Sequence, residues 1–397
     1  MKKNLLFVMP SLSAGGGEKS LINLLSQIDY NLYNVDLFLF NKQGVLVNQI
    51  PSEVKILELA ANYRTYTRRM ISSVIHFLKN GQFHLAYSRI IYTAMNRMMN
   101  NMDISEQYSW KYIAKSHDAI SKEYDAAIGY LEKSSIYFLV EKVRANKKIG
   151  WIHTNYSSSS MDYRFDYPYF EQLDYMVTVS KECAESLKEN FKNLKGKVRV
   201  IHNIIAPEVI KSLAEDEIQD DFILEESFTN IVTIGRLSHE KGIDIAVEAC
   251  RQLIGKGLKV RWYVLGSGSE LKKLEKMIKK YGLDHHFKLL GFRENPYPYI
   301  KRCDIYVQPS RYEGKSIAID EAKILSKPII VTNFSTAKDQ ITDGVDGLIV
   351  EMSARAIAEG IGRLIQEKDF RCTLEENLSR LELGTEKEVN KLYQLLT

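Results

Sequence analysis

The sequence predicts an α/β protein with parallel sheets arranged in two domains. Short apolar runs alternate with longer amphipathic stretches along the whole 397-residue chain, of which 45% is hydrophobic. Strands with few polar interruptions, each followed by a helical stretch, are typical of a parallel sheet that helices cover on both faces. A chain of this length is also large enough to bury two separate cores.

The first half opens with a strand, a glycine loop and a helix. The apolar run Leu5–Met9 leads into three glycines at 15–17, and the amphipathic stretch SLINLLSQI follows. Such a unit turns backbone N–H groups toward a crevice. The hexapeptide GGGEKS resembles the end of a P-loop, but a P-loop requires glycine directly before its lysine, and Glu18 stands there. We therefore exclude an NTPase loop. Further strands are expected at 34–40, 126–130, 148–153, 175–180 and 197–203.

The second half repeats this alternation more strictly. Between the halves, the pattern dissolves into the acidic run EDEIQDD, so we predict a domain boundary near residue 205. The first domain is 1–205, the second is 206–379, and a final helix at 380–397 is expected to cross back to the first. Strands of the second domain are expected at 230–235, 260–266, 287–291, 304–310, 327–333 and 347–350.

The segment 59–102 departs from the alternation. It contains no acidic residue, and apolar and aromatic side chains lie between its basic ones: Arg64, Arg68, Arg69, Lys79, Arg89 and Arg97. Basic amphipathic helices of this kind lie on anionic lipid. A helical insertion that packs against its own domain, with its charges in water, would show the same pattern. Both hypotheses stay open at this point.

Composition narrows the class of protein. A net charge of +4 is too small, for this length, to indicate a nucleic-acid partner. Four scattered cysteines without a C-x-x-C pair predict neither a zinc site nor disulfides and fit a reducing cytosol. The apolar N-terminal run is broken by Pro10 and lacks a signal-peptide cleavage site, and no run reaches the length of a membrane span. We expect a cytoplasmic chain that can associate with the inner face of the plasma membrane through 59–102.

Chemistry-bearing residues follow three successive strands of the second half. Arg236 and Lys241 come after the first strand, and two cations at this spacing can hold a diphosphate. Gly266 and Gly291 end the next two strands, where glycine lets a backbone approach a ligand, although such turns also need glycine for geometry alone. Because open α/β sheets bind ligands at the carboxyl ends of their strands, these residues predict a ligand site.

Two glutamates complete this candidate site. Glu313 lies in the loop after the strand at 304–310, and Glu321 follows eight positions later. A helix that begins after Lys315 would place Glu321 one to two turns inside and offer its free N–H groups to a phosphate. The carboxylates can accept hydrogen bonds from sugar and ribose hydroxyls. Taken singly, each glutamate is also compatible with a capping or solvated role.

The set G-R-L-x-x-E-K-G, L-G-x-G, G-F and E-G-x(6)-E resembles the donor half of a retaining glycosyltransferase of family four. The resemblance covers about residues 230–350 in order and spacing. It implies the GT-B fold, in which two Rossmann-like domains with parallel sheets face each other across a cleft. In the first half, GGGEK resembles the Gly-Gly-x-Glu loop of such enzymes, and WIHTN resembles their strand-end histidine motif.

The resemblance assigns a role to each residue. Arg236 and Lys241 would hold the donor diphosphate, Glu313 would contact the transferred sugar, and His153 would point at the sugar or acceptor, although a structural role stays open for this histidine. The amides near Ser316 and Ile317 would meet the phosphates, Gly291 and Phe292 the base, and Glu321 the ribose. The donor-binding set is Gly235, Gly266, Gly291, Phe292, Lys315, Ser316, Ile317 and Glu321, and the acceptor-side loop is Gly15, Gly16, Gly17 and Glu18.

The sequence departs from the family at two positions. Lys315 stands where an aromatic residue is usual, and Ser316 replaces a common glycine. The extra cation would select an acidic sugar or tighten phosphate binding.

The function implied is a hexosyltransferase-type, retaining transfer from a nucleotide sugar to a hydroxyl of a glycan or lipid-linked acceptor, in bacterial surface-polysaccharide or glycoconjugate assembly. No D-x-D pair is present, so we expect no metal and no cofactor beyond the donor substrate, with a UDP-sugar favoured over a GDP-sugar. The alternatives are a nucleotide-sugar epimerase and a non-catalytic GT-B scaffold. A dehydrogenase is excluded because AGGGEKS lacks the G-x-G-x-x-G spacing.

Overall fold

The computed structural model of this chain describes residues 2–13, 15–99, 101–218, 222, 225 and 227–396. The chain forms two compact units, of which the first comprises Met1–Ser13, Leu24–His202 and Glu388–Thr397 and the second Ala14–Asn23 and Asn203–Lys387. The chain changes unit after His202, where the sequence placed a boundary near 205. Ala14–Asn23 differs from the sequence-based division because its side chains bond to the start of the second unit: Ser20 donates to the Asn203 side chain at 2.7 Å and Asn23 to the Ile204 carbonyl at 2.9 Å.

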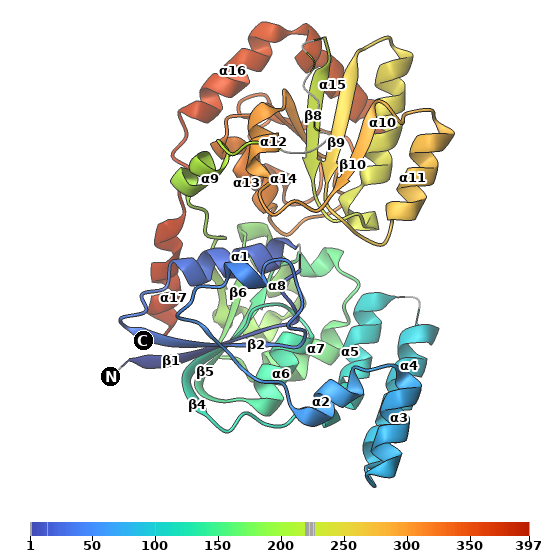
Figure 1. Cartoon of the computed structure of the whole chain (residues 1–397). Coiled ribbons are helices and arrows are strands. Elements are labelled where there is room, and N and C mark those ends of the chain that lie inside the picture. The colour runs from blue at the N-terminus through green and yellow to red at the C-terminus, as the bar shows by residue number, and fades with distance from the viewer. Residues whose placement is uncertain are drawn as a thin grey trace. The chain divides into compact units, whose positions relative to one another are not determined.

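The first unit holds a seven-stranded sheet, in which every strand pair is parallel and the order is β3-β2-β1-β4-β5-β6-β7. Figure 1 labels β1, β2, β4, β5 and β6 of this sheet. The sequence predicted all of these strands except the two-residue β3. Their bounds are β1 Lys3–Met9, β2 Tyr33–Leu39, β3 Lys55–Ile56, β4 Glu123–Gly129, β5 Arg144–Ile152, β6 Tyr175–Thr178 and β7 Val198–Val200.

Helices alternate with these strands along the chain. One face of the sheet, which includes Leu6 and Val8, packs with Phe138 and Leu187 in a single core. Helix α1, Gly16–Ser26, lies between β1 and β2 in the chain, although its residues up to Asn23 group with the second unit. The other helices are α2 Ala61–Tyr66, α3 Met70–Lys79, α4 Phe83–Met98, α5 Met102–Ile113, α6 Ser134–Lys142, α7 Tyr163–Phe170, α8 Lys181–Asn190 and α17 Val389–Leu396. Short 3₁₀ turns lie at Val47–Gln49, Ala114–Ser116, Tyr156–Ser158 and Lys192–Lys197, and a further one at Glu386–Glu388 lies where the chain returns from the second unit.

The second unit holds a six-stranded parallel sheet in the order β10-β9-β8-β11-β12-β13. The predicted strands are confirmed as β8 Thr229–Ile234, β9 Val260–Leu265, β10 Phe287–Gly291, β11 Ile305–Gln308, β12 Ile329–Thr332 and β13 Leu348–Val350. The helices are α9 Pro207–Leu213, α10 Ile243–Gly255, α11 Leu271–Lys280, α12 Tyr297–Arg302, α13 Ile317–Ile324, α14 Ala337–Gln340, α15 Ala354–Gln366 and α16 Lys368–Ser379, with a 3₁₀ turn at His239–Lys241.

Both faces of this second sheet are buried. On β9, Trp262 and Val264 join the core that contains α10 and α15, whereas Tyr263 and Leu265 join the core that contains α12 and α13. Successive side chains of a strand point to opposite faces, so an uninterrupted apolar strand requires a cover on each side. The α/β fold with parallel sheets in two units, predicted from the apolar runs, is confirmed.

The basic segment folds within the first unit as three helices, α2, α3 and α4. A left-handed glycine, Gly81 with φ +70°, lies in the turn between α3 and α4. The helices share a small core of their own, made by Tyr66, Phe77, Leu85 and Ala86. The segment is therefore a helical insertion with its own packing, as one of the two sequence-based hypotheses held.

Candidate functional site

The second sheet has a topological switch point between β8 and β11. These strands are neighbours, yet β9 and β10 continue on one side and β12 and β13 on the other. Open α/β sheets bind ligands at the carboxyl ends of the strands at such a point, because the outgoing loops diverge there. The loops after β8 and β11 carry Arg236, Lys241 and Glu313.

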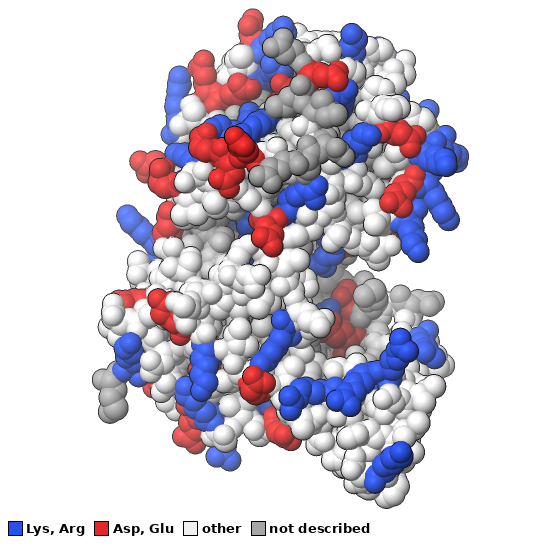
Figure 2. Space-filling model, viewed as in Figure 1, with Lys and Arg blue, Asp and Glu red and all other residues white. Residues whose placement is uncertain are grey.

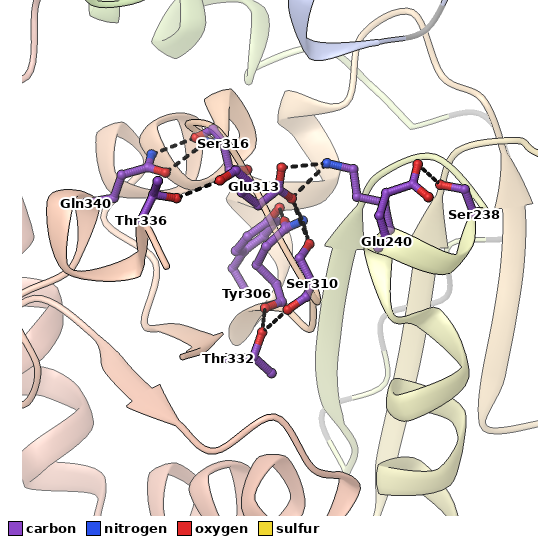
Figure 3. A network of polar contacts seen from close by, with 11 residues as sticks. Ser238, Glu240, Tyr306, Ser310, Glu313, Ser316, Thr332, Thr336 and Gln340 are labelled. Carbon is purple, nitrogen blue, oxygen red and sulfur yellow. Dashed lines mark hydrogen bonds and ion pairs between the residues drawn. The ribbon is translucent and has the colours of Figure 1, made fainter. Parts of the chain in front are cut away.

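Lys241 and Glu313 meet at this point. The Lys241 Nζ lies 2.7 Å from both carboxylate oxygens of Glu313, whose residue is 8% exposed. Glu313 Oε1 also accepts hydrogen bonds from the Ser310 hydroxyl at 2.7 Å and the Gln308 amide at 3.0 Å (Figure 3). A carboxylate held by three donors has one orientation, so the edge of the sheet is preorganised.

The strands below hold these donors in place. The Tyr306 hydroxyl donates to Gln308 at 2.6 Å, and the Thr332 hydroxyl of β12 donates to the Ser310 carbonyl. The Thr336 hydroxyl donates to the Glu313 carbonyl at 2.9 Å, which fixes the backbone of the loop as well (Figure 3). The position of Glu313 is thus set by β11, β12 and the turn before α14.

Arg236 is the second cation at this edge. It directly follows Gly235 at the end of β8, and its side chain is exposed. Within the described part of the chain, Arg236 forms no ion pair, so its guanidinium is open to an external anion. The charge of Arg236 also acts on the Glu18 carboxyl. Burial raises the pKa of Glu18, and a backbone hydrogen bond and the Arg236 charge oppose that rise.

The strand-end glycines have a structural reason. A Cβ on Gly266, whose φ is +152°, would lie 1.9 Å from the Gly235 carbonyl oxygen, and one on Gly268 would lie 2.3 Å from that of Leu237. Gly291 ends β10 with φ +77°. Glycine is therefore required for loop-to-loop packing at Gly266 and Gly268 and for its positive φ at Gly291, which is the geometric role weighed from the sequence. Phe292 follows and is half-buried.

The start of α13 differs in part from the expectation. The helix begins at Ile317, which places Glu321 in its second turn, as predicted. The Ser316 N–H, expected at a phosphate, instead donates to the Gln340 side chain at 2.8 Å, and the Gln340 amide donates back to the Ser316 carbonyl at 2.7 Å. This leaves Ile317 as the candidate phosphate-binding amide. Lys315 lies 3.5 Å from the Asp320 carboxylate, which partly compensates its charge.

Glu321 already has partners in this structure. It is 2% exposed, it forms an ion pair with Lys19, and it accepts a hydrogen bond from the Tyr297 hydroxyl at 3.2 Å. The Lys19 ammonium also lies 4.6 Å from the centre of the Tyr297 ring. The carboxylate expected at a ribose is thus held by a lysine that the sequence motifs did not single out.

The glycine segment is a helix start, whereas the sequence predicted a loop. Gly16 opens α1, so Gly16, Gly17 and Glu18 form its first turn and only Gly15 precedes it. A Cβ on Gly15 would lie 1.9 Å from Glu18 Oε2, because the Glu18 side chain folds back over this end of the helix. A carboxylate there complements the positive end of the helix dipole, which explains a helix that begins with two glycines. These residues group with the second unit, and their role beside an acceptor stays a prediction.

His153 follows β5 in the first unit. Its backbone N–H donates to Glu132 Oε2 at 3.1 Å, and its ring lies 5.1 Å from that of Tyr130. Burial lowers the pKa of His153 to about 3, so the ring is neutral at physiological pH. Its Nε2 is buried and has no hydrogen-bond partner among the described residues. A neutral imidazole with an unused ring nitrogen can bind one group of a ligand.

Glu132 is a functional candidate that the sequence motifs missed. It follows β4, which borders the switch point of the first sheet between β1 and β4. Burial raises the pKa of its carboxyl. The next residue, Lys133, adopts φ +63° and pairs with Asp103 at 2.9 Å and Glu106 at 2.8 Å, which holds this loop in a strained conformation. The signal that could have identified Glu132 is its place just beyond an expected strand.

The described residues form neither a metal-ligand cluster nor a helix that could span a membrane. No group of three or more His, Cys, Asp or Glu side chains among them is arranged to hold a metal ion. None of the helices in the same part of the chain combines the length and apolar character needed to cross a membrane.

Comparison with known proteins gives one family. Residues 214–380 match the family described as glycosyl transferases group 1. The chain is 27% identical over 206 residues to the N-acetylgalactosamine-N,N'-diacetylbacillosaminyl-diphospho-undecaprenol 4-alpha-N-acetylgalactosaminyltransferase of Campylobacter jejuni, covering 51% of this chain and 53% of that protein. It is 26% identical over 210 residues to the uncharacterized glycosyltransferase MJ1059 of Methanocaldococcus jannaschii, covering 50% and 52%. The chain thus spans about half the length of these curated relatives.

Solved structures resemble the chain over its whole length. Anabaena Alr3699/HepE in complex with UDP has a TM-score of 0.65 at 17% identity, covering 99% of both chains, and its complex with UDP-glucose has a TM-score of 0.67. At this identity the likeness shows the fold. Residues 214–380 are thus similar to the group 1 glycosyl transferases, and the chain has the GT-B fold.

Proposed function

We propose that this protein is a retaining, metal-independent glycosyltransferase that moves a hexose from a nucleotide sugar to a hydroxyl of a glycan or lipid-linked acceptor. The observation that carries the proposal is the Lys241–Glu313 pair at the switch point of the second sheet, inside the segment that matches the group 1 family. The UDP and UDP-glucose complexes of the Anabaena protein support a UDP-sugar donor.

The donor diphosphate would bind beside Arg236 and Lys241. As the bond between the sugar and the diphosphate breaks, negative charge grows on the leaving group, and these cations stabilise it. One preorganised hydrogen-bond donor, such as either of these cationic side chains, lowers the activation barrier of the transfer by roughly 3–4 kcal/mol. Here the two side chains take the part that a divalent metal plays in other transferases. Glu313 contacts the sugar, and Glu321 binds the ribose once Lys19 releases it.

Retention follows when the acceptor hydroxyl attacks from the face that the diphosphate leaves. The bond from the anomeric carbon to the diphosphate oxygen breaks, a bond to the acceptor oxygen forms, and the leaving diphosphate takes the acceptor proton. His153 is neutral at working pH because its pKa is lowered to about 3, so it acts by hydrogen bonding from Nε2 rather than as an acid. Glu132 positions His153 through its backbone N–H.

One relative supports the proposed acceptor and location. The Campylobacter jejuni protein is named for a diphospho-undecaprenol acceptor, which supports a lipid-linked acceptor for this chain as well. Surface-polysaccharide or glycoconjugate assembly would use such an acceptor at the inner face of the plasma membrane. The protein would then be cytoplasmic and peripheral to that membrane.

A thermal-shift screen against UDP-, GDP-, ADP- and CMP-sugars in EDTA tests the proposal. A ligand that binds only the native state raises its stability by about 2.7 kcal/mol at a hundredfold excess over the dissociation constant. We expect a shift with UDP-sugars that Glu321→Ala abolishes and the exposed control Glu208→Ala keeps. A shift without any product in the presence of acceptor extracts would favour a non-catalytic scaffold, and an isomerised donor would favour an epimerase.

A further inference from the structure

The outer face of α3 carries an exposed apolar stripe. Ile71, Ile75 and Leu78 are 68%, 46% and 46% exposed. Their i, i+4, i+7 spacing places them on one side of the helix. The opposite side carries Phe77, which is fully buried.

The neighbouring helix α4 repeats the arrangement. Phe83 and Tyr87 are 67% and 61% exposed, and Ile90 and Met98 continue the same side at 46% and 80%. Leu85 and Ala86 on the other side are buried in the core that the insertion shares with Tyr66. We call the seven exposed side chains the outer face: Ile71, Ile75, Leu78, Phe83, Tyr87, Ile90 and Met98.

The internal packing of the insertion does not use the outer face. Its inner sides already form a core, and the seven large apolar side chains remain in water. Scattered exposed apolar residues are common, but stripes at helical spacing on two helices that share one core indicate an interaction surface. The two sequence-based hypotheses for this segment, a packed helical insertion and a lipid-binding surface, are therefore compatible. The inner sides of the helices pack in a core, and the outer face is available to a partner.

The charge around the outer face selects the partner. No acidic residue occurs between Leu59 and Met102, and the exposed cations include Arg68, Arg69, Lys79 and Arg97. Figure 2 shows the projecting part over α3 and α4, at its lower right, as white surface with blue side chains and no red.

The placement of these cations is unfavourable for the helix itself. Arg69 is the N-cap residue of α3, and the first turn of α3 contains no acidic residue. A positive charge at a helix N-terminus opposes the helix dipole, so Arg68 and Arg69 do not stabilise α3. A function outside the fold accounts for them better.

We propose that the outer face docks on an anionic lipid bilayer. The apolar stripes enter the boundary between headgroups and acyl chains, and the flanking cations contact the anionic headgroups. A second copy of this chain is the poorer partner, because pairing the same face would bring the two sets of cations together without a carboxylate between them. This docking is independent of the transfer chemistry, so either can fail without the other.

Flotation of the full-length chain with vesicles tests the proposal. We expect binding to phosphatidylglycerol–phosphatidylcholine vesicles, little binding to phosphatidylcholine alone, and weakening in high salt. A variant that combines Ile71→Ser, Phe83→Ser and Tyr87→Ser should bind the vesicles at least about tenfold more weakly. Each substitution removes apolar area that the bilayer would bury. A variant that combines Arg68→Gln and Arg69→Gln should bind the vesicles more weakly, by about fivefold or more for each positive charge removed.

A matched control uses apolar side chains that are similarly exposed elsewhere. Leu32→Ser, Val209→Ser and Val345→Ser, at residues 56%, 57% and 48% exposed, should leave vesicle binding unchanged. Circular dichroism checks that each variant is folded, and the two arginine substitutions serve if the serine variant is not. The proposal is overturned if the wild-type chain ignores phosphatidylglycerol, or if neither outer-face variant changes binding. It is also overturned if light scattering shows a dimer that the same substitutions dissociate.

Discussion

The Nζ of Lys241 lies 2.7 Å from both carboxylate oxygens of Glu313, which joins the loops that follow β8 and β11. These strands border the switch point of the second sheet. The pair therefore ties together the two sides of the site expected to bind a diphosphate and its sugar. Its partners Ser310 and Gln308 fix the carboxylate before any ligand arrives.

Lys241→Gln should lower the free energy of unfolding by about 1–3 kcal/mol, because it leaves the buried Glu313 carboxylate without its cation. Urea denaturation at neutral pH measures this. Lys211→Gln is the matched control, since the Lys211–Glu208 pair is 3.1 Å long but exposed on both sides, and we expect a change within about 0.5 kcal/mol. Equal effects of the two substitutions would contradict the structural role of Lys241.

Gly266→Ala should destabilise the chain by at least about 2 kcal/mol, since its Cβ would lie 1.9 Å from the Gly235 carbonyl oxygen and its φ of +152° is strained for alanine. Gly255→Ala in α10 provides the contrast. Nothing lies within 4 Å of its added Cβ, and alanine favours a helix over glycine by about 0.5–1 kcal/mol. Thermal unfolding of both variants measures the two effects. An unchanged stability of Gly266→Ala would show that the loops after β8 and β9 can move apart to accommodate the added Cβ.

His117→Phe should flatten the acid side of the stability profile. His117 stacks on Tyr63 at 4.0 Å between ring centres, and burial, with a smaller effect of the Lys142 charge, lowers its pKa to about 3. In the unfolded chain His117 takes up a proton near pH 6.5, whereas in the folded chain it stays neutral down to about pH 3. The folded state therefore loses stability as the pH falls below about 6.5.

Between about pH 7.5 and pH 5, the free energy of unfolding should fall by about 2 kcal/mol less in His117→Phe than in the wild-type chain. Urea denaturation of both proteins at each pH measures the difference. An unchanged slope would show that His117 titrates alike in the folded and unfolded chains.

Glu132→Ala should slow transfer about tenfold or more and leave UDP affinity within about twofold, because Glu132 holds the His153 backbone N–H in the first unit. Glu132→Gln keeps a hydrogen-bond acceptor and should recover part of the rate. Steady-state transfer kinetics and calorimetry with UDP separate the two effects. A parallel loss of UDP affinity would mean that Glu132 contributes to the donor site, contrary to our assignment.

The strands could be predicted because their signal is local. Runs such as Leu5–Met9 and 230–235 are apolar and short, and the structure confirms each as a strand. Lys55–Ile56 was missed because two residues carry no periodicity. The start of α1 at Gly16 was missed because glycine disfavours helices, and the stabilising return of Glu18 over the helix end is not visible in the sequence.

The candidate site could be predicted only as a set of strand ends. Topology brings Lys241 and Glu313 together because β8 and β11 are neighbours, whereas the sequence predicted a shared ligand site but not this ion pair. The pairing of Glu321 with Lys19 and of the Ser316 amide with Gln340 depends on side chains distant in sequence, which no local pattern encodes. Glu132 was missed because no motif singled it out, although its place just beyond an expected strand was visible in the sequence. Its partner, the His153 N–H, lies 21 residues away.

The measurement that tests the account most directly is a calorimetric titration of UDP into the full-length chain in the presence of EDTA. We predict binding without metal, weakened at least about tenfold when Arg236→Gln and Lys241→Gln are combined and unchanged in Lys211→Gln. Absence of UDP binding, or equal affinity in the double variant, would contradict a diphosphate site at the carboxyl edge of the second sheet.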